Sequence, residues 1–277
     1  MPATAEAKRS CPNCGVTAPY RRAYPIDDAL QRTWGLSNAL TDLFNRREGS
    51  ICSNCGVNLR GQGLAKAILE SRHGFGEASL RSWVQAANAD RLAVCELNQC
   101  HELHHTLTGL DDLTYAEYGT KTQQNIEKMT YGSNTFDLLL HSETIEHVND
   151  AAGAADECRR VIKPDGLVLF TTPVIWGRKT RRRAVADGDA IHHLLEPSYH
   201  DRPTVDYLVF HEYGRDLDAV LRVSLSLADW RNQNYVFSSG KTPSSIRPLT
   251  KLRLVTLEKL AETLAFRPGR LSAAIRQ

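Results

Sequence analysis

The sequence predicts an α/β protein in which a small metal-binding module precedes a doubly wound sheet. Two observations carry this prediction. Residues 136–173 read as a strand, a helix, a turn and a second strand, and two nearly identical Cys-x-x-Cys-Gly motifs lie within the first 56 residues. Because a strand-helix-strand crossover of this length belongs to a parallel sheet, we expect ligands to bind beyond the carboxyl ends of the strands.

The composition sets the broad class of the protein. With 277 residues, 42% hydrophobic and 24% charged, the chain has room for one large globular domain and a small module. The net charge of +2 argues against a nucleic-acid partner. No apolar segment reaches the roughly 18 residues of a membrane span, and the N-terminus lacks an apolar signal core, so we expect a cytoplasmic protein.

The two cysteine motifs predict a metal site. Cys11-Pro-Asn-Cys14-Gly and Cys52-Ser-Asn-Cys55-Gly repeat one pattern, in which two intervening residues let both sulfurs reach one ion and the glycine allows a tight turn. Four thiolates around a tetrahedral zinc make a closed, structural site. The 37 residues between the pairs require an inserted hairpin and a short helix near 36–44. The alternative is two unrelated pairs of reduced cysteines.

The segment from 63 to 240 is predicted to form the large domain, after a tail and metal module at 1–62. Its first half should contain helices at 64–69 and 80–87, a hinge at His73-Gly74-Phe75-Gly76, a strand at 92–97, a helix at 100–107 and a strand at 113–118. Residues 211–221 resemble the last helix of a known α/β fold, and we expect a strand at 223–227 and an antiparallel edge strand at 235–237 after it. Residues 241–277 form a basic tail.

The stretch 136–173 is the most regular in the chain. Residues 136–140 form a nearly all-apolar run, as expected of a parallel strand covered on both faces. Apolar residues then recur at steps of three and four from Ile145 to Ile162, which predicts one face of a helix. The turn residues at 163–166 should end that helix, because Pro164 lacks a donor and Gly166 can close a turn. Residues 167–170 form the next strand.

These residues carry a resemblance to a known family. Phe-Asp-Leu-Leu-Leu at 136–140, Glu-His-Val at 146–148 and Arg-Arg-Val-Ile-Lys-Pro-Asp-Gly at 159–166 resemble the second half of a class I S-adenosylmethionine-dependent methyltransferase. With the cysteine motifs, the chain is similar to bacterial type 11-like methyltransferases that carry an N-terminal zinc ribbon. The resemblance implies a Rossmann-like, seven-stranded methyltransferase sheet, S-adenosylmethionine as cofactor, and methyl transfer to a small-molecule or glycan-like acceptor.

The resemblance also implies where the cofactor binds, with one departure. Glu96 matches the acidic residue that ends the first strand of the family. The turn that follows, from Asn98 through Cys100 to His101, contains no glycine, whereas the family has a glycine-rich turn that lets the backbone approach the cofactor. We therefore expect side chains at Asn98 and Cys100 to obstruct the usual approach to the amino-acid part of the cofactor.

Further cofactor contacts follow from position in the sequence. Glu117 lies 21 residues after Glu96, where a carboxylate can accept the ribose hydroxyls. Asn125 and Ile126 match the position that the family uses near adenine. His141 and Ser142 complete the expected set, because they end the strand at 136–140 on the ligand-binding edge.

Catalysis of methyl transfer to a hydroxyl needs a base, and histidine is the natural one at neutral pH. The candidates are His147, which lies in the Glu-His-Val match, and His192 and His193, which lie in the long connection at 174–203. A basic run at 178–183 in the same connection predicts an anionic acceptor; its alternative is a solvated face.

Three other functions compete. The missing glycines fit a non-catalytic binding protein that kept the fold and lost the cofactor. The ribbon and the basic tail fit an RNA methyltransferase, although the near-neutral charge argues against it. Finally, His101-Glu102-Leu-His-His105 satisfies H-E-x-x-H, a pattern that binds zinc on a helix in metalloproteases, but no third ligand is identifiable.

Overall fold

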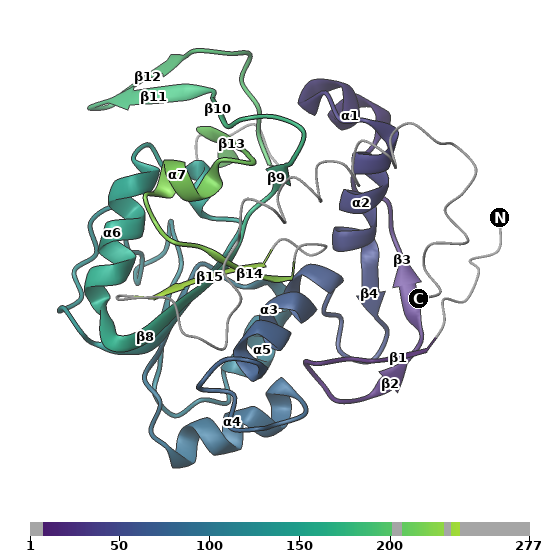
Figure 1. Cartoon of the computed structure of the whole chain (residues 1–277), viewed down its shortest axis with the longest axis vertical. Coiled ribbons are helices and arrows are strands. Elements are labelled where there is room, and N and C mark those ends of the chain that lie inside the picture. Colours follow the sequence, from purple (N-terminus) through teal and green to yellow (C-terminus); the bar gives the residue numbers. More distant parts are fainter. Residues whose placement is uncertain (1–7, 201–206, 230–233, 239–277) are drawn as a thin grey trace.

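The computed structural model describes residues 8–200, 207–229 and 234–238, and within them the main sheet has the strand order β14-β15-β8-β7-β5-β6 (Figure 1). Strands β6, β5, β7 and β8 run parallel, while β15 is antiparallel to both β8 and β14. The strands are β5 (Val94–Leu97), β6 (Leu113–Ala116), β7 (Phe136–Ser142), β8 (Ile162–Thr171), β14 (Ser226–Asp229) and β15 (Asn234–Ser238).

The expected α/β architecture with a parallel sheet is confirmed, but the described residues contribute six strands to the sheet instead of seven. Between β6 and β7, where a further helix and strand would have to fit, the chain forms turns and one isolated bridge between Asn125 and Lys128. This connection is too short for both elements. The predicted antiparallel strand at 235–237 is present as β15, with β14 outside it at the edge.

Helices cover both faces of the sheet. One layer contains α3 (Leu59–Leu69), α4 (Leu80–Ala89) and α5 (His104–Leu107), and the other contains α6 (Ala151–Val161) and α7 (Leu217–Leu221). On β7, Leu138 and Leu140 pack against the first layer, whereas Leu139 packs against the second. Successive residues of a strand point to opposite faces, so a doubly covered strand must be apolar throughout, as the sequence at 136–140 is.

The N-terminal module joins two small antiparallel sheets to two helices. Strands β1 (Arg9–Ser10) and β2 (Thr17–Ala18) pair with each other, as do β3 (Tyr20–Arg22) and β4 (Ser50–Cys52). Between the cysteine pairs lie α1 (Asp28–Trp34) and α2 (Asn38–Gly49), whose first turns are capped by the side chains of Asp27 and Ser37. The helix expected near 36–44 is therefore present and longer than predicted.

The helix predicted from Ile145 begins later than expected. Residues Ile145–His147 form a single 3-10 turn, and α6 starts at Ala151, where the Asp150 side chain accepts a hydrogen bond from the Gly153 amide at 3.0 Å. Asp is a strong N-cap, and the apolar spacing upstream of it does not outweigh that signal. The predicted stop at 163–166 is a bulge inside β8, since Phe136 pairs with Ile162 and Leu138 pairs with Leu167.

The helix predicted over 211–221 is wrong in its first half. Residues His211–Gly214 form β13, which pairs parallel with β9 (Val174–Ile175) and antiparallel with β10 (Arg181–Arg182). A Cβ atom on Gly214 would lie 2.1 Å from the carbonyl oxygen of Arg178, so only glycine permits this close approach of the two segments. The helical residues are those of α7 alone.

The long connection at 174–203 is more structured than a covering loop. After β9 and β10, its chain forms a hairpin of β11 (Ala184–Asp187) and β12 (Ala190–His193), which projects from the body at the top of Figure 1. The predicted basic tail at 241–277 lies outside the described residues. None of the described helices is long and apolar enough to cross a membrane.

Candidate active site

The turn after β5 keeps a glycine-like backbone without a glycine. Asn98 has φ of 58°, in the left-handed region that Asn tolerates better than most residues. Its Oδ1 accepts a hydrogen bond from the Tyr118 amide at 2.8 Å, and its Nδ2 donates to Thr144 Oγ1 at 3.2 Å. The side chain therefore ties the end of β6 to the segment that follows β7.

Glu96 stabilises the turn after β5 through hydrogen bonds within the protein. Its side chain is fully buried, Oε1 accepts a hydrogen bond from the Cys100 amide at 2.8 Å, and Oε2 lies 2.6 Å from Nδ1 of His104. A carboxylate only accepts, so His104 donates. Both oxygens of Glu96 are thus engaged inside the protein, and the fold uses this residue to hold the turn in place.

Glu117 follows β6 at the same edge and is half-buried. The Tyr115 hydroxyl donates to its Oε2 at 2.5 Å, and the Tyr115 ring packs against the His104 ring with centroids 4.4 Å apart. The carboxylate is therefore held at the carboxyl end of β6, next to the turn that Asn98 and Glu96 organise.

The remaining predicted cofactor residues differ in position. Asn125 is exposed and accepts the Glu127 amide at 2.9 Å, while Ile126 packs in the core cluster that includes Leu97 and Ala116. His141 and Ser142 point away from solvent. His141 is 1% exposed and stacks on Phe170, and the Ser142 hydroxyl contacts Thr171 and Arg60.

A buried ion network joins the N-terminal module to the end of β7. Arg47 of α2 is 1% exposed and pairs with Glu143 at 2.7 Å, and Arg60 of α3 pairs with Glu48 at 3.0 Å and donates to Ser142. Burial would raise the pKa of the Glu143 carboxyl, but the charges of Arg47 and Arg60 outweigh it and lower that pKa to about 2. Glu143 is therefore a carboxylate at neutral pH.

A second polar cluster lies beyond the ends of β7 and β8. Glu146 is 1% exposed and accepts the Thr172 hydroxyl at 3.0 Å, and the rings of His147 and His200 meet edge to face with centroids 4.9 Å apart. A pocket borders the cluster, and its lining residues are Trp34, Phe44, Glu146, Pro173, Ile175, Ser198, His200, Val209, His211 and Glu212. The pocket thus combines side chains from α1 and α2 with the edge of the sheet.

Of the three predicted catalytic histidines, only His147 belongs to this cluster. His192 and His193 are exposed on β12, and the described residues show no hydrogen bond or ring contact between them and His147. Sequence reasoning missed Glu146 and His200. Glu146 had a usable signal in its position beside His147, just after a buried strand, whereas His200 lies in an irregular segment without a recognisable pattern.

The basic run is only partly available to a ligand. Arg178 and Arg183 both pair with Glu212, at 2.7 and 2.8 Å, and Arg182 donates to the Asn149 side chain at 2.8 Å. Arg181 is exposed on β10. Three members of the run are therefore engaged within the protein, and the predicted contact with an anion falls mainly to Arg181 and Lys179, which are exposed.

The H-E-x-x-H pattern does not assemble a metal site in the described part of the chain. His101 lies in a 3-10 turn with φ of 54°, and His105 has an exposed side chain that pairs with Glu102 at 3.1 Å. Neither histidine belongs to a group of three or more potential ligands there. The metalloprotease hypothesis loses the helix and the third ligand that it requires.

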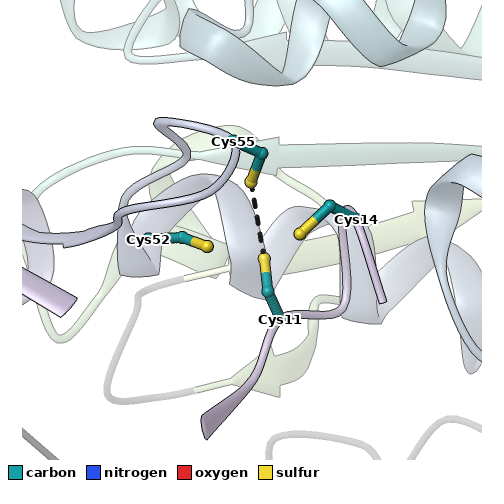
Figure 2. Close-up of side chains that lie close together, drawn as sticks. All are labelled: Cys11, Cys14, Cys52 and Cys55. Atoms are coloured by element: carbon teal, nitrogen blue, oxygen red, sulfur yellow. Dashed lines mark hydrogen bonds between the residues drawn. The ribbon is translucent and has the colours of Figure 1, made fainter. Parts of the chain in front are cut away.

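The four predicted zinc ligands converge. The Sγ atoms of Cys11, Cys14, Cys52 and Cys55 all lie within 4.8 Å of one another and point toward a common centre (Figure 2). The two motifs also share a backbone pattern, because the amides of Gly15 and Gly56 donate to the carbonyls of Cys11 and Cys52 at 2.8 and 2.9 Å. Both glycines have φ near 77°, which explains why each motif ends in glycine.

One part of the chain is similar to known proteins. Residues 77–170 match the family described as "Methyltransferase domain". The glycine/sarcosine/dimethylglycine N-methyltransferase of Actinopolyspora halophila is 26% identical over 129 residues, which are 41% of this chain and 23% of that protein. The chain therefore spans about a quarter of the length of this curated relative.

Similar solved structures cover more of the chain at lower identity. DesVI of Streptomyces venezuelae is 10% identical and covers 62% of this chain and 92% of its own, with a TM-score of 0.36. The sugar N-methyltransferase KedS8 from Streptoalloteichus is 13% identical and covers 57% and 86%, with a TM-score of 0.35. An S-adenosylmethionine-dependent methyltransferase from Aquifex aeolicus is 10% identical and covers 52% and 79%, with a TM-score of 0.32.

The matched family segment contains β5, β6 and β7, nearly all of β8, and the turns at their carboxyl ends. It includes the Asn98 turn, the buried Glu96 that holds it, and Glu117. Residues 77–170 are therefore similar to a methyltransferase domain, and their strands form the parallel core of the main sheet.

Proposed function

We propose that the protein transfers a methyl group from S-adenosylmethionine to a small-molecule acceptor, with a glycan-like compound as one candidate. The observation that supports this most is that the matched segment contains a left-handed turn at Asn98, directly after β5, and a positioned carboxylate, Glu117, directly after the neighbouring strand β6. When bound, the cofactor supplies an activated methyl group, so the protein has to orient the acceptor and accept its proton.

The residues at the edge fit this cofactor. Glu117 would accept the ribose hydroxyls, with its carboxylate oriented by Tyr115. The exposed Asn125 and the apolar Ile126 would lie near the adenine. The amino-acid part would meet the backbone of the turn at Asn98, whose φ of 58° reproduces what glycine usually provides.

The acceptor is proposed to enter the pocket beside Glu146 and His200. Its lining mixes aromatic rings with histidines and carboxylates, which suits a small polar compound. The name of the curated relative refers to small amines, which agrees with this size class. His147 remains the predicted catalytic residue nearest the pocket, since its ring contacts that of His200.

Calorimetry tests the cofactor proposal. A hydrogen bond to a charged group contributes about 1.5 to 3 kcal/mol, so Glu117→Ala should weaken S-adenosylmethionine binding by about 10- to 150-fold. Asp112→Ala is the matched control, because it removes an exposed carboxylate at the opposite end of β6. Equal binding by the wild type and Glu117→Ala would refute the ribose contact. Absence of binding to the wild type at millimolar cofactor would favour the non-catalytic binding protein.

We also propose that the four cysteines hold a structural zinc ion. Four sulfur ligands around one centre, with duplicated turns, fit a closed tetrahedral site that contributes folding free energy directly. Elemental analysis should find zinc that is lost when Cys11 and Cys52 are both changed to Ser. Cys158→Ala, which removes a buried thiol of α6 instead, should retain it. Zinc that survives the double change would contradict the assignment.

A further inference from the structure

Three side chains outside the cysteine site bring potential metal ligands together. One ligand atom each from Glu146, His147 and His200 lies within 4.8 Å of the other two. Glu146 Oε1 is 3.9 Å from His147 Nε2 and 3.5 Å from His200 Nδ1. Metal-ligand bonds of about 2.0 to 2.2 Å place the ligands of a tetrahedral ion about 3.4 Å apart, so these atoms are near that spacing before any adjustment.

The Glu146 carboxylate has one oxygen that the protein leaves unsatisfied. Oε2 accepts the Thr172 hydroxyl at 3.0 Å, whereas Oε1 is buried and has no hydrogen-bond partner among the described residues. The side chain is 1% exposed, so water does not compensate for the missing partner at the surface. Burying a carboxylate oxygen in this way is unfavourable unless a cation or a donor faces it.

His147 is oriented as a ligand. Its Nδ1 lies 2.9 Å from the carbonyl oxygen of Leu208, and because a carbonyl only accepts, Nδ1 carries the proton. In the neutral imidazole, Nε2 then has a free lone pair on the side of Glu146. Metal-binding histidines commonly have their second nitrogen bonded to a carbonyl or carboxylate in this manner. The lone pair on His147 Nε2 and the Oε1 atom of Glu146 face each other, so a positive charge between them would stabilise both.

We propose that Glu146, His147 and His200 bind a divalent first-row transition-metal ion. Two imidazole nitrogens and one carboxylate oxygen suit Zn²⁺, Fe²⁺ or Co²⁺ and differ from the four sulfurs of the cysteine site. A proton shared between Glu146 and one histidine is the competing occupant. It would satisfy the same oxygen without a metal, and the experiment below separates the two.

Three protein ligands leave at least one coordination position open. The adjoining pocket is lined by Glu146 and His200 themselves, together with Trp34, Ser198 and His211. The open position therefore takes an oxygen donor from the pocket, either water or a hydroxyl or carboxylate of the acceptor. The acceptor as ligand rests on the proposed function, whereas the metal site does not.

Titration with Co²⁺ tests the site in the full chain with its cysteine metal in place. The wild type should bind one further equivalent, giving visible d-d absorption without new sulfur-to-metal charge transfer. His200→Ala should weaken that binding by at least about 100-fold, since even outer-shell changes weaken metal sites by about 10- to 100-fold. Glu146→Gln should behave alike, and the partly exposed His200 is the safer change for folding.

His105→Ala is the matched control, because it removes an exposed histidine and also tests the H-E-x-x-H pattern. It should bind Co²⁺ like the wild type. The proposal is overturned if the wild type takes up no further Co²⁺, if His200→Ala binds it equally well, or if only His105→Ala loses it. Calorimetry with S-adenosylmethionine on the same samples keeps the two proposals apart, because Co²⁺ binding without cofactor binding would refute the methyltransferase activity alone.

Discussion

His141 should make the stability of the protein depend on pH. The imidazole is 1% exposed at the end of β7, and burial lowers its pKa from 6.5 to about 3. Between pH 6.5 and pH 3, His141 is protonated in the unfolded chain and neutral in the folded protein. The contribution of His141 is therefore complete above pH 6.5 and is lost as the pH falls toward 3. From pH 7 to pH 5 the loss amounts to about 2 kcal/mol of unfolding free energy.

Urea unfolding at pH 7 and pH 5 measures this contribution. His141→Leu removes the titrating group and keeps an apolar side chain against Phe170, so the variant should lose about 2 kcal/mol less than the wild type over this interval. Burial lowers the pKa of His211 as well, to about 4, so only the difference between the two proteins is assigned to His141. His192→Leu, at an exposed position, is the control. The same loss in His141→Leu and in the wild type would refute the reasoning.

Three further outcomes are expected. Asn98→Val should destabilise the protein by about 1 to 3 kcal/mol in urea unfolding, because a β-branched residue is strained at φ of 58°, whereas Asn98→Gly keeps this backbone. Arg47→Met should cost about 3 kcal/mol by removing the buried ion pair with Glu143, and adding Glu143→Gln should restore part of it. Arg181→Glu should raise the KM of an anionic acceptor severalfold at low salt and leave cofactor affinity unchanged, and an unchanged KM would make the run a solvated face.

The parallel core was predictable because its signals are local. Residues 136–140 are apolar on both faces of the strand, and each cysteine motif has the spacing of a metal-binding pair. The strand, the crossover and the cysteine cluster could therefore each be predicted from a short stretch of sequence. The helix predicted at 211–214 failed for a non-local reason. His211–Gly214 is a strand because it lies between β9 and β10, and a pairing with residues more than 25 positions away leaves little trace in its own sequence.

The same distinction between local and non-local signals applies to the candidate site. The obstruction expected at the glycine-free turn stays a prediction, and residue types alone do not reveal that Asn98 adopts a left-handed backbone and directs its side-chain amide toward Tyr118 and Thr144. Glu146 and His200 were missed because they are 54 residues apart and meet only through the fold. Residue type and spacing predict a distant contact where both partners carry a recognisable motif, as the two cysteine pairs do, and Glu146 and His200 have no such motif.

The ion network of Arg47, Arg60, Glu143 and Ser142 bears on how such a protein can be recombined. The arginines belong to the first 60 residues, while their partners end the strand β7 of the matched domain. A hybrid that exchanged the ribbon and α2 for those of another protein would lose Arg47 and leave the carboxylate of Glu143 facing an unmatched surface. The two parts can therefore be exchanged only as a pair, because a junction between them separates Arg47 from Glu143.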